Sequence, residues 1–146
     1  MALEDVIEQN DLAWSEEGDF IIDRGDIGAT FSSLTRIITQ EVTDRIKSSS
    51  GDWKLYRDRG AGLDSFRGEV NNEKTRRLIR LSVTKALTRN RFMDEDDFSV
   101  SVAPISHNSV AIRIDIDMTQ FNSFPDDTFV YKAIYDTEGK GPFRVR

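Results

Sequence analysis

Carboxylates are the side chains of this chain that could most readily do chemistry. Glu41 and Asp44 stand three residues apart, and residues 94–97 read DEDD. A glycosidase needs two carboxyl groups on opposite sides of a cleft, with the acid partner usually in an apolar pocket. No such pocket is indicated around Glu41 and Asp44, and we interpret them as ordinary solvated residues of one helix.

Metal and nucleophile chemistry has little support. The DEDD run lacks the oxygen spacing and the glycine of a calcium loop, so we interpret it as a solvated turn. The chain has no cysteine and a single histidine, His107, at a predicted turn. Thiol nucleophiles, disulfides and zinc clusters are therefore excluded. The stretches "DRGDIG" and "RGAG" do not match a phosphate loop. The sequence predicts a protein that is not an enzyme, with no catalytic residue, metal or cofactor.

Length and composition predict one soluble domain. The chain has 146 residues, of which 38% are hydrophobic and 32% charged. No apolar run approaches the roughly 18 residues of a membrane span, and the acidic start is unlike a signal peptide. The net charge of -6 is segregated, since residues 57–91 contain ten Lys/Arg and four Asp/Glu. Such polarity suits oriented docking to other proteins.

Two amphipathic helices are expected. The first covers residues 29–48, where apolar residues recur at steps of three and four. The second covers residues 72–91 and opens with an asparagine suited to an N-cap. Its core stripe is Ile79, Val83, Ala86 and Leu87. Leu78 and Leu81 form a separate flank beside Lys85, which indicates either deeper burial of the helix or a partner surface.

Alternation of apolar and polar residues predicts the strands. Residues 98–118 read as an antiparallel hairpin with one buried face, whose inward residues include Val100, Val102, Val110, Ile112 and Ile114. Short strands are expected at Phe20–Ile22 and Trp53–Tyr56, and a further pair at residues 128–135 and 143–145. The predicted fold is α+β: two helices packed on a small, mostly antiparallel sheet with a central hairpin, plus N- and C-terminal extensions.

The basic second helix raises the question of nucleic-acid binding. Arg76, Arg77, Arg80 and Arg91 cluster in it, and aromatic residues lie nearby in the sequence. The whole chain is acidic, however, with a pI of about 4.8, and no nucleic-acid module pattern is present. We therefore expect no nucleic-acid partner and keep a nucleic-acid module as a minor alternative.

The order of these elements resembles a known family. The carriers are "GDIGATFSSLTRIITQEV", "WKLYRDRGAGLDSFRGEVNNEKTRRLIRLSVTKAL" and "FSVSVAP" followed by "SVAIRIDIDM". Together they are similar to the baseplate wedge proteins, or sheath initiators, of contractile phage tails, type VI secretion systems and R-type pyocins. The resemblance covers residues 19–118 as one domain. Residues 1–18 form an N-terminal arm and residues 119–146 a C-terminal extension, both outside it.

The resemblance implies a structural role in the virion, at the tail baseplate. Six copies would ring the tail axis, join the baseplate wedge proteins and contact the tail tube or hub proteins. They would template the first sheath ring by accepting β-strands from the tail sheath protein, with the open backbone edges of the hairpin as the acceptor. Some family members carry a lysozyme label, which the carboxylate search does not support. The alternative reading is another protein-binding adaptor with an α+β fold.

The passage between residues 53 and 66 supplies further interface candidates. Many family members carry a Glu-Pro-Arg-like signature before the glycine turn, and this chain departs from it with Asp58-Arg59-Gly60. We expect its glycines to take positive φ angles, so that its arginines project towards a partner or pair with Asp58 and Asp64. Together with the basic helix, the candidates are Arg57, Arg59, Gly60, Gly62, Leu63, Arg67, Arg76 and Arg80.

Overall fold

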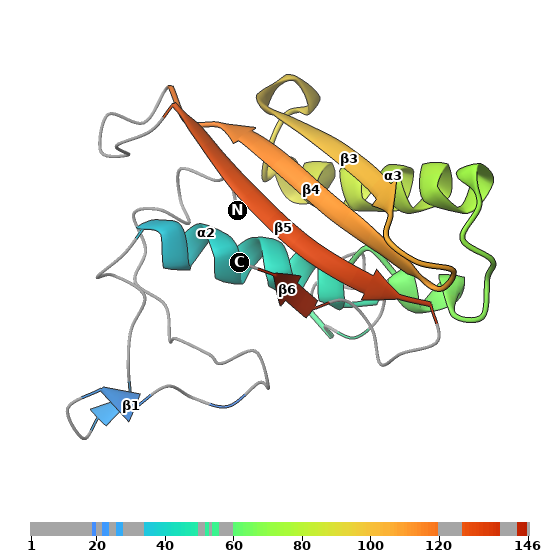
Figure 1. Cartoon of the computed structure of the whole chain (residues 1–146). Helices are drawn as coiled ribbons and strands as arrows, with labels where there is room; N and C mark the ends of the chain where they lie inside the picture. Colours follow the sequence, from blue (N-terminus) through green and yellow to red (C-terminus); the bar gives the residue numbers. More distant parts are fainter. Residues whose placement is uncertain are drawn as a thin grey trace.

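The protein is a two-layer α+β structure (Figure 1). The computed structural model describes residues 19, 22–23, 26–27, 34–49, 52, 54–55, 60–119, 127–137 and 143–145. One layer is an antiparallel sheet with the strand order β3-β4-β5-β6, and the other consists of helices α2 and α3 on one face of that sheet. The predicted fold class is confirmed.

The central hairpin forms where the alternation predicts it. Strand β3 covers Phe98–Pro104 and strand β4 covers Ser109–Asp117. Their register runs from Phe98 opposite Ile116 to Pro104 opposite Val110. Every second residue of β4 is buried, which is the pattern of a sheet with one face on the core.

The C-terminal strands complete the sheet. Strand β5, Thr128–Asp136, pairs with the whole of β4, and the short strand β6, Phe143–Val145, pairs with β5. The predicted C-terminal strand pair is thus confirmed. A separate two-stranded ribbon pairs β1, Ile22–Asp23, with β2, Asp26–Ile27. The strand predicted at residues 20–22 meets β1 only at residue 22, and residues 20 and 21 lie outside the described part.

Helix α2 covers Leu34–Lys47, inside the predicted range, and residues 29–33 lie outside the described part. Helix α3 covers Glu73–Thr88 and continues into the 3₁₀ turn η3, Arg89–Arg91. The α-helical part is shorter than predicted because the C-cap residue Arg89 is extended, with a ψ of 144°. Asn90 and Arg91 follow with left-handed φ angles of 58° and 54°, which turn the chain away from the helix axis.

The core lies between the two layers. The predicted α3 stripe is buried, and it packs with the inward faces of the strands and with α2. The members of this core include Ile38, Val42, Ile46, Ile79, Val83, Leu87, Phe92, Val110, Ile112, Ile114, Ile116, Tyr131 and Tyr135. In the part of the chain that the structure describes, no helix is long and apolar enough to cross a bilayer.

The strand predicted at residues 53–56 is wrong at the positions that can be checked. Lys54 and Leu55 lie in a bend, and the Leu55 side chain is 90% exposed. The chain turns just after α2, where the Ser49 N–H donates to an Asp52 carboxylate oxygen and the Asp52 N–H donates to the Ser49 carbonyl. Four alternating residues do not make a strand without a partner strand.

Candidate protein interface

The outer edge of β3 is the first candidate. The Ile105 N–H donates to the Ser109 carbonyl, so residues 105 and 109 form a hydrogen-bonded pair of the hairpin. Such pairs alternate along an antiparallel ladder. The backbone groups of Ser99 and Ser101 therefore face β4, whereas those of Val100 and Val102 face away from it. Among the described residues, no strand pairs with this outer edge.

Pro104 lies in the same phase as Val100 and Val102, six residues after Phe98 in the strand. A proline has no N–H to donate, so it is tolerated where the N–H would point away from the ladder. The open edge therefore offers N–H donors at residues 98, 100 and 102, and it loses the next donor at residue 104.

The second edge of the hairpin is closed. The expectation of open edges on both sides of residues 98–118 is wrong for β4, because β5 pairs with it from Asp117 to Ser109. Val110, Ile112 and Ile114 are buried in the core, since they lie on the inward face of a central strand. Val100 and Val102 are partly buried and pack against the same core. The side chains of Val110, Ile112 and Ile114 therefore support the sheet and cannot contact a partner.

The glycine passage meets the C-terminal end of α2. The Ala61 N–H donates to the Arg45 carbonyl and the Gly62 N–H donates to the Ser48 carbonyl, at 2.9 and 3.2 Å. These bonds satisfy carbonyls that a helix end leaves without partners. Gly60 and Gly62 have φ angles of 117° and 65°, which confirms the expected positive φ. A Cβ at Gly60 would lie 2.3 Å from the Ser48 carbonyl oxygen, so the turn also requires a close backbone approach.

The residues after these glycines are held mainly inside the molecule. Leu63 begins the 3₁₀ turn η2, Leu63–Phe66, and its side chain is buried in the core, which corrects its place among the interface candidates. Its carbonyl accepts a 2.6 Å hydrogen bond from the Tyr135 hydroxyl. Arg67 is exposed and lies 3.7 Å from Asp64, which agrees with the internal-pairing alternative. Arg57 and Arg59 lie outside the described residues, as does Asp58.

The two remaining arginine candidates differ from each other. The Nη1 group of Arg76 donates to the Asn71 side-chain oxygen at 2.9 Å, and the Asn71 amide donates to the carbonyls of Ser106 and Ser109. Arg76 thus orients Asn71, which holds the turn between β3 and β4. Arg80 is exposed on α3.

The exposure of Leu78 and Leu81 distinguishes deeper burial of the helix from a partner surface. Their side chains are 42% and 48% exposed, so α3 is not buried on both sides. Deeper burial is excluded, and the partner-surface reading stays a prediction.

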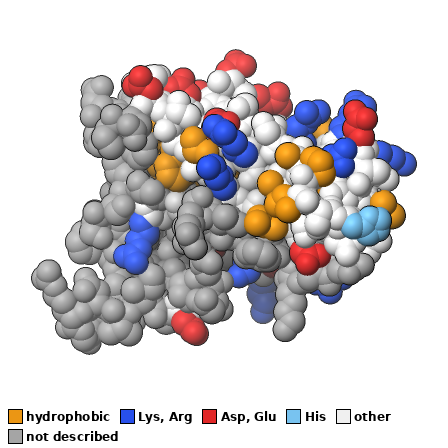
Figure 2. All heavy atoms as spheres, in the orientation of Figure 1, with side chains coloured by type: hydrophobic (Ala, Val, Ile, Leu, Met, Phe, Trp, Pro, Cys, Tyr) orange, Lys and Arg blue, Asp and Glu red, His pale blue; other side chains and the backbone are white. Residues whose placement is uncertain are grey.

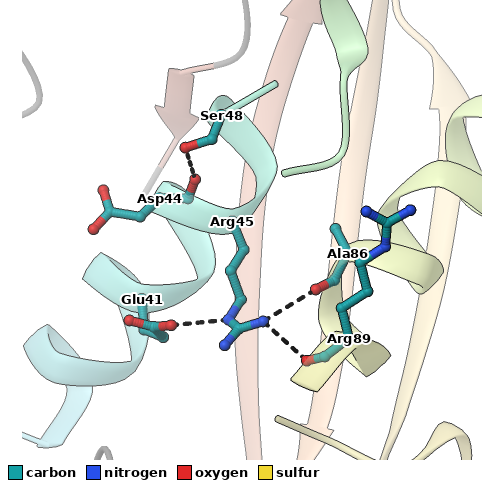
Figure 3. Close-up of polar contacts among 6 residues, drawn as sticks. All are labelled: Glu41, Asp44, Arg45, Ser48, Ala86 and Arg89. Carbon is teal, nitrogen blue, oxygen red and sulfur yellow. Dashed lines mark hydrogen bonds and ion pairs between the residues drawn. The ribbon is translucent and has the colours of Figure 1, made fainter. Parts of the chain in front are cut away.

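One of the two carboxylates considered for catalysis, Glu41, forms a structural ion pair. Glu41 binds the Nε of Arg45 at 2.8 Å (Figure 3). Arg45 is only 2% exposed, lies 4.1 Å from the centre of the Phe92 ring, and donates to the carbonyls of Ala86 and Arg89 at the end of α3. A cation at a helix C-terminus complements the helix dipole. Asp44 lies on the same helix, where its carbonyl accepts the Ser48 hydroxyl.

The DEDD run forms a small cap. Asp94 precedes the 3₁₀ turn η4, Glu95–Asp97, and Asp97 accepts a hydrogen bond from the Asp94 N–H in a reciprocal capping box. No group of acidic or histidine side chains in the described residues is arranged to hold a metal ion.

Two pKa shifts accompany structural hydrogen bonds. Hydrogen bonds from the N–H and hydroxyl of Thr119 lower the pKa of Asp117. Burial raises the pKa of Tyr135, and the charge of Asp64 adds to this effect. Both shifts are explained by local structure.

Comparison with known proteins shows the fold. The chain is similar to the crystal structure of a candidate tail lysozyme from Geobacter sulfurreducens, with a TM-score of 0.53 and 20% sequence identity. The match covers 78% of this chain and 93% of that protein. No family model and no curated protein matches the chain.

Proposed function

We propose that this chain is a non-enzymatic structural component of a contractile tail baseplate, and that its β3 edge accepts a β-strand from the tail sheath protein. The baseplate wedge proteins would be its other partners, with six copies around the tail axis. Main-chain pairing would supply affinity, and the alternating side chains would set the register.

The observation that carries the proposal is the outer edge of β3. Its outward N–H and carbonyl groups at residues 98, 100 and 102 have no strand opposite them in the described part of the chain. The hairpin is held from the other side by β5, so the edge is already formed within the sheet of the free chain. A preformed edge lowers the ordering cost of strand addition.

The fold likeness and the sequence resemblance supply the context. The structural neighbour carries a tail lysozyme description, and the resemblance points to the tail baseplate independently of it. The engagement of Glu41 by Arg45 and the capping role of residues 94–97 support a non-enzymatic role.

A proline placed at residue 102 tests the proposal. Val102→Pro removes an outward N–H and no ladder bond to β4, and Pro104 already occupies the same phase of β3. We expect the variant to fold but to lose sheath attachment when it replaces the natural chain in the particle. Attachment is measured by electron microscopy of assembled tails, and folding by thermal unfolding.

Val102→Ala is the matched control, because it shortens the same side chain and keeps the N–H. It should assemble like the natural chain. Normal sheath attachment by a folded Val102→Pro variant would overturn the strand-accepting role.

A further inference from the structure

One face of α3 carries exposed leucines between exposed lysines. Lys74, Leu78, Leu81 and Lys85 are all exposed. At about 100° per residue, these four positions fall within about 60° of one another on the helix surface. They form a line about 16 Å long, with two leucines in the middle and a lysine one turn beyond each end. We call this line the α3 face.

The surroundings of the α3 face are basic. Arg77 and Arg80 are exposed on the same helix, and Glu73, in its first turn, is the one acidic residue of α3. Within the described residues, no ion pair involves either lysine of the α3 face or these two arginines. None of these side chains belongs to the core, since the buried stripe lies on the opposite side of the helix.

We propose that the α3 face binds an amphipathic helix of another protein, one with two apolar residues at i and i+3 and an acidic residue one turn beyond each of them. Leucines three residues apart on a helix form a ridge that fits between the side chains of a second helix. The lysines at both ends then meet the acidic residues, which fixes the register of the partner.

The charge pattern disfavours a second copy of this chain as the occupant. The spacing of the α3 face is symmetric, with four residues from each lysine to its leucine and three between the leucines. Antiparallel pairing of two copies would bring Lys74 opposite Lys85, and parallel pairing would bring each lysine opposite itself. Both arrangements place like charges together, so an acidic partner fits better.

The test uses the full chain and two designed helical peptides. The acidic peptide has leucines at i and i+3 with a glutamate one turn beyond each, and the basic peptide has lysines in place of those glutamates. ¹⁵N NMR titration should show shifts confined to residues 73–88 with the acidic peptide. For so small an interface, we expect a Kd on the order of 100 micromolar.

Exchange of charge is the decisive variant. The Lys74→Glu/Lys85→Glu variant should bind the acidic peptide about tenfold more weakly than the natural chain does. The same variant should bind the basic peptide about tenfold more tightly than the natural chain does. A role of the lysines in folding alone would not produce this gain. The variant Leu78→Ser/Leu81→Ser should abolish binding, whereas Val70→Ser/Ile105→Ser, which removes exposed apolar residues elsewhere, should not.

Several results would overturn the inference. They are the absence of binding by the acidic peptide, equal binding of both peptides, and shifts outside α3. Tighter binding of a single-stranded DNA oligonucleotide to the same residues would identify a nucleic-acid site instead. A dimer of the free chain that is lost on Leu78→Ser/Leu81→Ser would identify a second copy as the occupant. None of these results bears on the β3 edge, so this inference and the proposed function fail separately.

Discussion

At the scale of single residues, the molecule is held by contacts between positions far apart in the sequence. Gly60 meets Ser48, Arg45 reaches the end of α3, and the Tyr135 hydroxyl binds the Leu63 carbonyl. Each contact satisfies a backbone carbonyl or fits closely against one. A buried carbonyl without a hydrogen-bond donor destabilises the folded state, so we expect these residues to contribute to the free energy of unfolding.

The two glycines of the turn should differ sharply in their tolerance of alanine. Gly60→Ala combines a φ of 117° with a Cβ pressed against the Ser48 carbonyl, and the backbone must move. We expect it to lower the free energy of unfolding by about 3 kcal/mol. Gly62→Ala has a φ of 65° and open space, so it should cost about 1 kcal/mol. Urea unfolding measures both, and equal losses would contradict the close approach.

Tyr135→Phe should reveal a dependence on pH. The variant loses the buried bond to the Leu63 carbonyl, which should cost about 1–2 kcal/mol near neutral pH. Burial raises the pKa of Tyr135 above its ordinary value of 10.0. The contribution of the protonated Tyr135 hydroxyl to the free energy of unfolding is fully present below pH 10.0, and it is lost as the pH rises through the raised pKa.

The stability difference between the natural chain and Tyr135→Phe should therefore narrow at alkaline pH. Urea unfolding at pH 8 and pH 11 measures the change. A constant difference across this range would mean that the Tyr135 hydroxyl titrates as it does in the unfolded chain.

At the scale of elements, the hairpin turn depends on a helix that lies outside the sheet. Asn71, just before α3, donates to two carbonyls of the turn between β3 and β4 and accepts a bond from Arg76. The next residue, Asn72, instead caps the helix through the Thr75 N–H. Two neighbouring asparagines thus stabilise two different elements.

Asn71→Ala should loosen the turn by about 1 kcal/mol, because the carbonyls of Ser106 and Ser109 each lose one donor at a partly exposed site. Amide hydrogen exchange should become faster at Ile105 and Ser106 and should not change along the ladder between β4 and β5. The control Asn72→Ala should cost about 1 kcal/mol as well, with faster exchange in the first turn of α3. Faster exchange at the turn in both variants would contradict this separation.

The elements with strong local patterns are those that the sequence predicts well. The 98–118 hairpin carries a long period-two alternation, and the α3 stripe carries a clear helical period. The proposed strand at residues 53–56 rested on four residues and failed at Lys54 and Leu55. Alternation in β5 predicts a strand with one buried face, but it does not say that β4 is the neighbour, because pairing depends on the whole sheet.

The outcome for several interface candidates also depends on tertiary packing that local sequence patterns do not specify. Val110, Ile112 and Ile114 were expected beside an open edge, and the addition of β5 closes that edge. Leu63 was a candidate because of its place in the glycine turn, and only the packing against the core shows that it is buried. Sequence reasoning missed Arg45 and Asn71, because the backbone carbonyls to which they donate are 35 or more residues away in the sequence.

At the scale of the whole molecule, the two proposed surfaces belong to neighbouring elements, since α3 packs against β3. They differ in chemistry. The β3 edge offers main-chain groups, and the α3 face offers leucines and cations. Because the two surfaces use different groups, Val102→Pro should leave binding of the acidic peptide unchanged.

Figure 2 shows that, on the visible side of the molecule, hydrophobic side chains occur as small groups separated by polar and charged atoms.

The proline at the end of β3 also bears on solubility. An unpaired strand edge is a place where copies of a protein can stack into fibrils, and long flat edges are the most dangerous. Here the edge is seven residues long, and it closes with Pro104, which cannot extend a ladder. Pro104 therefore discourages the stacking of further copies of the chain along this edge.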